Sequence, residues 1–402
     1  FVVASVCGIM VQFGMPNLVM RATAAVSEFL SSMALCWCPD AASPFLYIHV
    51  RFKKSIMTRQ LNSKQNYYYW RGNKRQTTRS ILPDFVEELT PEICDGGLAT
   101  KLGAVAHFGR RDVVVIDSWG KDALLLSLVK AAFGFRLVVR LRGDPIATIR
   151  RKGKLSNALV ALATRFILSR ADMLVFNSRH LWSHPDYRRY SAKADVVYNP
   201  LMYDHSAAPA ETEAPSPGGL RILSAMNFGY MEKIRPLGEA ITRWVNTDFM
   251  MENDITWTIC GGYSDTDSYR WFIARVAEVE NGDRIKFIGY QENMPALYAS
   301  HDVLAHLSGL EAFPNTVLEA SYFGLPTITI PQSGGTLEAV EDGVNGRIIA
   351  DGPAFREALL RYARDPARRH RHGANARANV IKKFSIESQK AAMTTMLRKR
   401  FG

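Results

Sequence analysis

Short apolar segments alternate with segments of helical spacing along most of this 402-residue chain. The apolar segments are typical of strands that are buried on both faces of a sheet. Such an alternation favours parallel sheets, because each strand then reaches its neighbour through a helix. The pattern runs through residues 1–203 and starts again at Leu220. We therefore predict an α/β protein with two doubly wound, Rossmann-like parallel-sheet domains, as the length of the chain also favours.

The segment between these halves differs from both in composition. Residues 204–219 are rich in Pro, Ala, Ser and Gly and poor in large apolar side chains, so they are predicted to be a linker. The N-terminal domain would then span residues 1–203 and the C-terminal domain residues 220–384. A basic, amphipathic helix is expected at the end of the chain, within residues 385–402.

The N-terminal domain is expected to begin with a strand, a loop, a helix and a second strand. We assign residues 1–7 to a buried parallel strand, residues 18–32 to the helix and residues 34–38 to the next strand. The loop between the first strand and the helix contains Gly8 and Gly14. It has no G-x-G-x-x-G pattern, so the fingerprint of nicotinamide and flavin sites is absent. Further along, residues 93–108 are predicted to form a helix.

The net charge of +12 and a pI near 9.5 favour anionic partners. The charge is concentrated in residues 51–79, which include no Asp or Glu and carry the aromatic run at residues 67–70. This segment is either a solvated loop or a patch that docks on anionic lipid headgroups, with its aromatic rings at headgroup level. Nucleic acid is disfavoured as a partner, because no DNA- or RNA-binding motif accompanies the patch.

Cysteine usage and the first forty residues bear on location. The five cysteines are odd in number and scattered, which favours reduced thiols in a cytoplasmic setting. Polar residues interrupt the apolar N-terminal stretch before it reaches 18 residues, and no basic segment precedes it. We therefore expect neither a membrane-spanning helix nor a signal peptide there.

The stretch from residue 301 to Gly324 carries the clearest chemical pattern. A short apolar run suits a buried strand, and helical spacing then continues to Gly324, a plausible helix stop. The free N–H groups of Asn315, Thr316 and Val317 would lie in the first turn of this helix, at the carboxyl end of the strand. In open α/β sheets ligands bind at this edge, and a helix N-terminus there suits a diphosphate.

Two carboxylates flank this predicted anion site. Glu311 lies in the loop before the helix, and Glu319 lies about one turn inside it. Carboxylates do not bind phosphate, but they accept hydrogen bonds from hydroxyl groups. The pattern therefore favours a ligand that carries a diphosphate and hydroxyl groups together, as a nucleotide sugar does.

The stretch resembles the donor site of GT-B glycosyltransferases of the group 1 family (family 4), whose signature is Glu, seven residues, Glu. The resemblance extends upstream to Arg284-Ile-Lys-Phe-Ile-Gly-Tyr and downstream to Gly334-Gly-Thr-Leu-Glu-Ala-Val, and it covers roughly residues 221–351. It implies a GT-B fold, in which two Rossmann-like domains face each other across a cleft. It also implies that the last helix, within residues 385–402, packs back on the N-terminal domain.

The resemblance implies roles for several residues of the C-terminal domain. Glu319 would hold the ribose hydroxyls, and Glu311 would bind sugar hydroxyls and orient C1. Lys233 would join the helix N-terminus in stabilising the leaving diphosphate. The other donor-binding positions implied are Phe313, Gly261, Ile288 and Gly289, the last two in a segment whose backbone reads the nucleobase.

Two positions depart from the family pattern. Asn227 stands where the family has an Arg, and Arg235 is a nearby cation that could replace it. Arg142 stands where many relatives have a His, and it cannot act as a base. It would bind a phosphate or carboxylate of the acceptor, or it would pair with Asp144. Gly8 and Gly14 would belong to the acceptor or phosphate loop.

The resemblance implies a retaining glycosyltransferase that moves a hexose from a nucleoside-diphosphate sugar to an acceptor hydroxyl. The acceptor would be a cell-surface glycan precursor or a lipid-linked saccharide, reached from the cytoplasm by an enzyme that is peripheral on the inner face of the plasma membrane. No cofactor and no metal are expected. The alternatives are a nucleotide-sugar epimerase of the same fold, which the intact Glu311–Glu319 block disfavours, and a non-catalytic basic binding module.

Overall fold

The computed structural model describes residues 4–6, 9–11, 65–70, 92–94, 103–105, 108–146, 149, 156–203, 219–262, 266–279 and 284–402. The chain forms two compact units, Phe1–Ser63 and Lys64–Gly402. The second unit holds both six-stranded sheets. The predicted linker falls almost entirely outside the described residues.

The first unit contains two short strands that pair with each other. Strand β1 (Ala4–Val6) runs antiparallel to β2 (Ile9–Val11), with Ala4 opposite Val11. The prediction of a parallel strand over residues 1–7 is therefore wrong. The two apolar runs are separated by only two residues, whereas a parallel pair needs a crossover of a dozen or more. The predicted helix at 18–32, the strand at 34–38, Gly8 and Gly14 lie outside the described residues.

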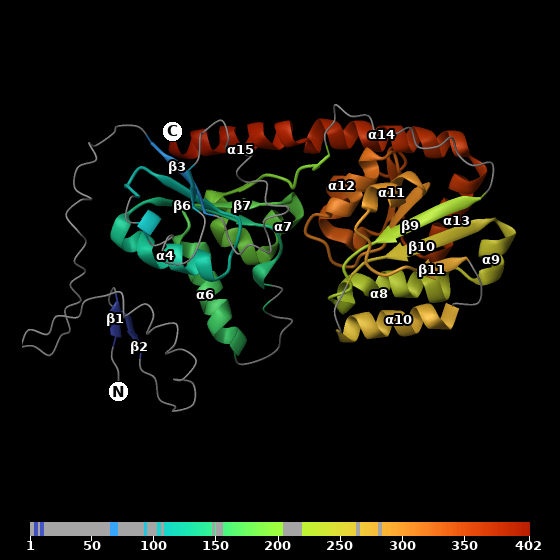
Figure 1. The fold of residues 1–402 in the computed structure, drawn as a ribbon, viewed down its shortest axis with the longest axis horizontal. Helices are drawn as coiled ribbons and strands as arrows, with labels where there is room; N and C mark the ends of the chain where they lie inside the picture. The colour runs from blue at the N-terminus through green and yellow to red at the C-terminus, as the bar shows by residue number, and fades with distance from the viewer. Residues whose placement is uncertain are drawn as a thin grey trace, which may run out of the picture. The chain divides into compact units, whose positions relative to one another are not determined.

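The first six-stranded sheet is entirely parallel and has the strand order β4-β3-β5-β6-β7-β8 (Figure 1). Its strands are β3 (Tyr67–Trp70), β4 (Glu92–Cys94), β5 (Val113–Ile116), β6 (Arg136–Leu141), β7 (Met173–Phe176) and β8 (Ala194–Val196). Strands β5 and β7 are buried along their whole length, as expected for a sheet that is covered on both faces.

Strands β3 and β4 correct two predictions. The aromatic run Tyr67–Trp70 is a buried strand and does not stand at a lipid surface, because Trp70 has no exposed area and its indole N–H donates to Asp122 at 3.1 Å. The predicted helix over 93–108 is wrong at its start, because residues 92–94 form a strand, whereas the described residues 103–105 are helical as predicted. A short apolar run fits a strand and a buried helix equally well. The rest of the basic segment 51–79 lies almost entirely outside the described residues.

Helices cover both faces of the first sheet. Side chains of α4 (Lys121–Phe133) and α6 (Ser156–Arg170) pack on one face. The C-terminal helix α15 (Ile386–Phe401) packs on the other face, where Met393 and Leu397 contact the side chains of β3, β5 and β6 (Figure 1). The Arg136 guanidinium donates to the carbonyl oxygen of Phe401 at 3.0 Å, which fixes the end of α15.

The second sheet is also parallel, with the order β11-β10-β9-β12-β13-β14. Its strands are β9 (Leu220–Ala225), β10 (Ile255–Cys260), β11 (Ile285–Phe287), β12 (Val303–His306), β13 (Thr327–Thr329) and β14 (Gly346–Ile348). The strand order reverses direction beside β9, which neighbours both β10 and β12. This is the topological switch point at which open α/β sheets bind ligands.

Two groups of helices enclose the second sheet (Figure 1). One face is covered by α8 (Met231–Glu239), the π-helical turn η5 (Ala240–Trp244), α9 (Thr247–Glu252), α10 (Asp267–Val279) and α13 (Gly352–Arg364). The other face is covered by α11 (Met294–Ala299), α12 (Asn315–Tyr322) and α14 (Pro366–Phe384). The remaining described elements are α7 (Arg179–Ser183) and the 3-10 segments η4 (Pro185–Lys193) and η6 (Pro331–Glu338).

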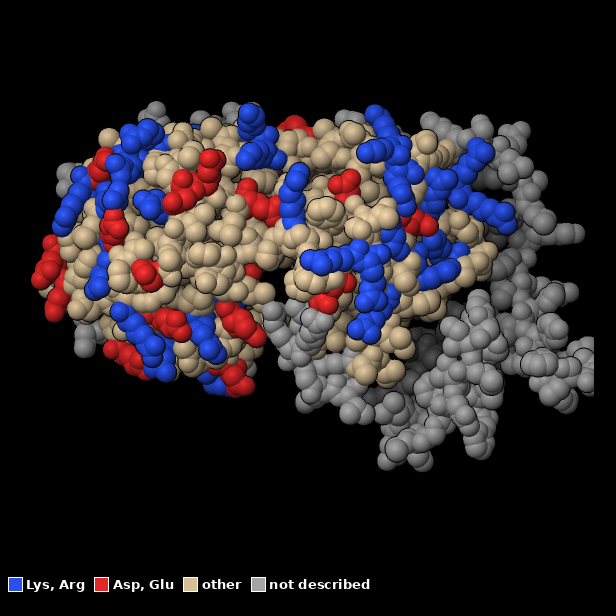
Figure 2. Space-filling model, turned by 180° about the vertical axis from the view of Figure 1, so that it is seen from behind, with Lys and Arg blue, Asp and Glu red and all other residues tan. Residues whose placement is uncertain are grey.

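Surface charge is uneven over the face drawn in Figure 2. Lys and Arg gather over the half that carries the first sheet, whereas Asp and Glu are more frequent over the half with the second sheet. No described helix combines the length and the apolar composition that crossing a bilayer requires.

Candidate active site

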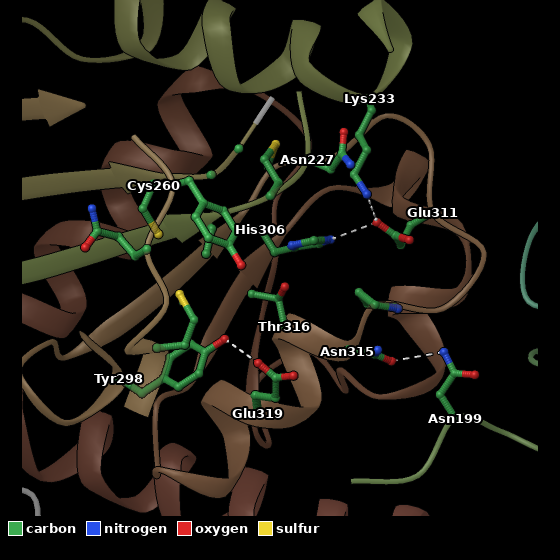
Figure 3. A pocket seen from close by; sticks show the side chains of 18 of the residues that line it. Asn199, Asn227, Lys233, Cys260, Tyr298, His306, Glu311, Asn315, Thr316 and Glu319 are labelled. Carbon is green, nitrogen blue, oxygen red and sulfur yellow. Dashed lines mark hydrogen bonds and ion pairs between the residues drawn. The ribbon is translucent and has the colours of Figure 1, made fainter. Parts of the chain in front are cut away.

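A pocket of about 950 Å³ opens at the carboxyl ends of β9, β10 and β12 (Figure 3). Four loops of the second sheet contribute to it: the loops after β9, β10 and β11 (Ile285–Phe287) and the loop that joins β12 to α12. Arg142 and Asn199 line it from the first sheet's side. The lining residues include Asn227, Lys233, Cys260, Gly261, Tyr290, Tyr298, His306, Glu311, Phe313, Asn315, Thr316 and Glu319.

Glu311 is a largely buried, ionised carboxylate that lines the pocket. Its Oε2 accepts from Lys233 Nζ at 2.7 Å, and its side chain is 13% exposed. Burial by itself raises the pKa of Glu311, but His306 and Lys233 outweigh this and hold the pKa at about 2. The carboxylate is therefore charged at neutral pH and can accept hydrogen bonds from hydroxyl groups.

The backbone of Glu311 is held by the glycine pair of η6. Gly335 N–H donates to the Glu311 carbonyl oxygen at 3.1 Å. A side chain at position 335 would place its Cβ 1.8 Å from the carbonyl oxygen of Ala312, so only glycine allows this approach. The glycine pair Gly334-Gly335, which is part of the resemblance to the family, therefore has a structural role here, because it positions the Glu311 loop.

Lys233 reaches the pocket from the first turn of α8. Its ammonium group carries three donors, of which the described residues use one, for Glu311. The other candidate cation, Arg235, lines a separate hollow beside α8 and α10 and does not line this pocket. Arg235 therefore does not replace the family Arg at Asn227.

The N-terminus of α12 forms the middle of the pocket. Pro314 is the N-cap residue and supplies no side-chain cap, so the first N–H groups of the helix have no partner within it. Asn315 and Thr316 line the pocket, whereas Val317 is fully buried and does not. Asn315 Oδ1 accepts from Asn199 Nδ2 at 3.0 Å, which ties the helix start to the segment that follows β8 of the first sheet.

Glu319 lies on the same helix, about one turn after its start. Its Oε2 accepts from the Tyr298 hydroxyl at 2.8 Å. Tyr298 is fully buried, and burial together with the Glu319 charge raises its pKa, so its hydroxyl stays protonated and donates. The two carboxylates thus flank the N-terminus of α12 (Figure 3).

Arg142 lies on the opposite wall, with a side chain that is 31% exposed. Its Nη1 is 3.6 Å from Asp117 Oδ2, and Arg140 shares that carboxylate at 3.3 Å. The ion pair that Arg142 forms among the described residues is with Asp117 and not with Asp144, whose Oδ1 accepts from the Tyr187 hydroxyl at 2.6 Å. Arg142 is therefore a cation with one face toward the pocket.

Of the remaining predicted positions, Asn227, Gly261 and Phe313 line the pocket. Asn227 lines it, but its Oδ1 accepts from the N–H of Gly229 at 2.7 Å. Gly261 N–H donates to the Gly289 carbonyl oxygen at 2.9 Å, and a Cβ at Gly261 would lie 1.9 Å from Met226 O. Ile288 and Gly289 do not line the pocket, although the next residue, Tyr290, does. Phe313 is a buried residue of the pocket wall, and its ring packs against Tyr198 and Phe384.

The pocket residues that were not predicted include His306, Tyr298 and Asn199. His306 ends β12 and is 2% exposed, with its Nε2 3.7 Å from Glu311 Oε2. The sequence did contain a feature that could have identified His306 as a site residue: it is a histidine at the end of an otherwise apolar strand, directly before the Glu311 loop. Tyr298 and Asn199 lie in segments where nothing in the residue pattern marks a site, so only the folded contacts identify them.

Comparison with known proteins agrees with this geometry. Residues 210–379 match the model of the family described as "Glycosyl transferases group 1". The chain is 23% identical over 303 residues to N-acetyl-alpha-D-glucosaminyl L-malate synthase of Bacillus anthracis, covering 73% of this chain and 76% of that one. It is 33% identical over 129 residues to D-inositol 3-phosphate glycosyltransferase of Salinispora tropica, covering 30% and 26%.

Among solved structures, the Anabaena protein HepE in complex with UDP-glucose superposes with a TM-score of 0.62. The identity is 16%, and the match covers 83% of this chain and 99% of that one. Two parallel Rossmann-like sheets with a pocket at the switch point define the GT-B class of fold. The chain has the GT-B fold, and its residues 210–379 resemble the group 1 glycosyltransferases.

Proposed function

We propose that the enzyme transfers a hexose, with retention of configuration, from a nucleoside-diphosphate sugar to an acceptor hydroxyl. One observation carries this proposal: Lys233, the N-terminus of α12 and the carboxylates of Glu311 and Glu319 all border the same pocket. A cation beside free N–H groups suits a diphosphate, and flanking carboxylates suit hydroxyl groups. Retention rests on the family resemblance.

The proposed transfer requires positive charge beside the nucleoside diphosphate, which is the leaving group. When the bond between C1 and the diphosphate breaks, negative charge grows on the diphosphate oxygen, and a bond from C1 to the acceptor oxygen forms. Lys233 and the helix N-terminus lie at fixed positions near each other, so they stabilise that charge without reorganising. Glu311, beside Lys233, then orients the sugar through its hydroxyl groups.

The donor is expected to bind with its nucleoside toward Glu319 and Tyr290. HepE was solved in complex with UDP-glucose, which supports a nucleotide sugar of this kind as the donor here. The base is left open, because the segment at Ile288 and Gly289 would read it through backbone groups. UDP-, GDP- and ADP-sugars are therefore all candidates.

The acceptor is expected to carry a phosphate or a carboxylate. Arg142 has a face toward the pocket on the side opposite the helix N-terminus, and its guanidinium can bind such a group bidentately. Two relatives support this class, since their names contain L-malate and D-inositol 3-phosphate. A lipid-linked saccharide phosphate or a glycan precursor fits the same chemistry. Cytoplasmic and peripheral membrane location stay predictions.

We expect no metal requirement, because Lys233 and the helix N-terminus supply the charge that a divalent ion supplies in other transferases. Donor turnover should be unchanged after treatment with EDTA. A loss of turnover that is restored by added Mg²⁺ or Mn²⁺ would contradict this expectation.

The test is incubation of the purified chain with UDP-, GDP- and ADP-sugars, with and without acceptors that carry a phosphate or a carboxylate. Release of the nucleoside diphosphate together with a product of retained anomeric configuration, read by NMR, supports the proposal. An inverted product contradicts retention. Absence of any sugar transfer or hydrolysis would favour a non-catalytic binding module.

A further inference from the structure

His306 is the one described residue at the pocket whose polar atoms are buried and without hydrogen-bond partners among the described residues. Both Nδ1 and Nε2 of its ring have no such partner there. The side chain is 2% exposed, and it lines the pocket with its ring directed toward Glu311 (Figure 3). Buried polar atoms without partners are rare, and each one needs an explanation.

The backbone of His306 is held firmly while its ring is not. Thr329 Oγ1 donates to the His306 carbonyl oxygen at 2.9 Å, and Ser333 Oγ approaches the same oxygen. The ring Nε2 is 3.7 Å from Glu311 Oε2, which is beyond hydrogen-bond distance. A small movement of either side chain would close this gap, because the two groups already face each other.

Glu311 and the diphosphate of the donor would compete for the same partner, Lys233. Lys233 bonds the same Oε2 at 2.7 Å, and under the proposed function the diphosphate competes for that ammonium group. Among the described residues, the His306 imidazole is the second basic side chain within 4 Å of the Glu311 carboxylate. A buried carboxylate that loses its cation needs a replacement donor to stay charged and ordered.

We propose that His306 is a positioning residue for the donor: its Nε2–H bonds Glu311 when the diphosphate draws Lys233 away, and so holds the carboxylate against the sugar. This inference rests on the proposed function and adds a residue to it. The role requires the sugar, so binding of a nucleoside diphosphate alone should not need His306.

Three substitutions separate this role from a packing role. H306Q places an amide N–H near the position of Nε2, H306N places one near Nδ1, and H306L fills the space without a donor. UDP, GDP and ADP serve as sugar-free probes, and the matching hexose donors serve as substrates. The measurements are the melting temperature, the affinity for the diphosphate by calorimetry, and kcat and KM for the donor.

H306L should remain folded and melt near the wild-type temperature, because leucine fills the same buried space and only the electrostatic support of Glu311 by the imidazole is lost. Its affinity for the diphosphate should stay within about twofold of wild type, whereas its kcat should fall about tenfold or more, as should that of H306N. H306Q should recover most of the wild-type kcat. The combination of intact diphosphate binding with reduced kcat is what a packing role would not produce.

Wild-type kcat in H306L overturns the inference, and so does an H306Q variant as impaired as H306L. A common loss of melting temperature and diphosphate affinity in all three variants would assign His306 to packing and overturn it too. Failure of the proposed function is distinct, because the wild-type enzyme itself would then neither bind the diphosphates nor turn over any donor, and the inference would fall with it.

Discussion

At the scale of residues, the charge on Glu311 makes stability depend on pH. Its pKa in the folded enzyme is about 2, below its ordinary 4.5. A lowered folded pKa contributes stability that is complete above the unfolded value and is lost as pH falls toward the folded value. The melting temperature of wild type should therefore exceed that of E311Q at pH 7, and the difference should shrink between about pH 5 and pH 2. A difference that is constant over this range would contradict a charged, paired Glu311.

The Tyr298–Glu319 bond gives a second prediction at this scale. Y298F removes the donor to Glu319 Oε2, so the carboxylate is less well oriented for a ribose. Affinity for a nucleoside diphosphate should fall about threefold to tenfold, as loss of one hydrogen bond implies. Y362F is the matched control, because it removes a buried hydroxyl that bonds His372 away from the pocket. Calorimetry should find unchanged affinity in Y362F, and equal losses in both variants would refute the assignment.

At the scale of elements, η6 joins the two sheets through Glu338. Its carboxylate accepts the N–H groups of Arg179 at 3.0 Å and His180 at 2.8 Å, at the start of α7, and also the Tyr198 hydroxyl at 2.8 Å. Burial and this bond raise the pKa of Tyr198 to about 12, so the hydroxyl remains a donor. A negative charge at a helix N-terminus is also favourable.

E338A should lower the free energy of unfolding by about 1–3 kcal/mol, because it leaves several donors without their acceptor. E341A is the control, since Glu341 is an exposed carboxylate just after the same element. Urea unfolding measured by tryptophan fluorescence should separate the two variants. Equal stability of E338A and E341A would mean that the contact contributes nothing in solution.

The elements also show which parts of the fold could be predicted from the sequence and why other parts could not. The resemblance to the group 1 family over residues 210–379, the GT-B fold and the parallel sheets are confirmed, and β9 begins at Leu220, where the pattern was predicted to restart. The aromatic strand β3 was missed because four consecutive aromatic residues in a basic segment fit a surface patch and a buried strand alike. The site roles and the domain bounds stay predictions.

Within the site, the sequence pointed to residues whose spacing is local. Glu311, Glu319 and the start of α12 lie within nine residues of one another, so one motif reveals them. Tyr298, His306 and Asn199 reach the pocket through the packing of separate strands and helices. Their contacts depend on distances that no short pattern encodes. Arg142 was identified, but its partner Asp117 lies on a different strand end and was not.

At the scale of the whole molecule, two groups of residues in the pocket are proposed to bind different parts of the donor. Lys233 and the α12 N-terminus are proposed to bind phosphate groups, and Glu319 is proposed to bind the ribose. Ligands that bind only the folded state raise its stability by an amount set by their concentration and affinity. A saturating nucleoside diphosphate should therefore raise the melting temperature of the chain, and the nucleoside alone should do so much less at the same concentration.

Calorimetric binding of the best nucleoside diphosphate and of its nucleoside to wild type, K233A and E319Q tests this division most directly. K233A should weaken the diphosphate about tenfold or more, as loss of a buried ionic contact implies, and leave the nucleoside unchanged. E319Q should weaken both ligands by a similar factor. Wild-type affinity of K233A for the diphosphate, or no effect of E319Q on the nucleoside, would contradict the proposed division.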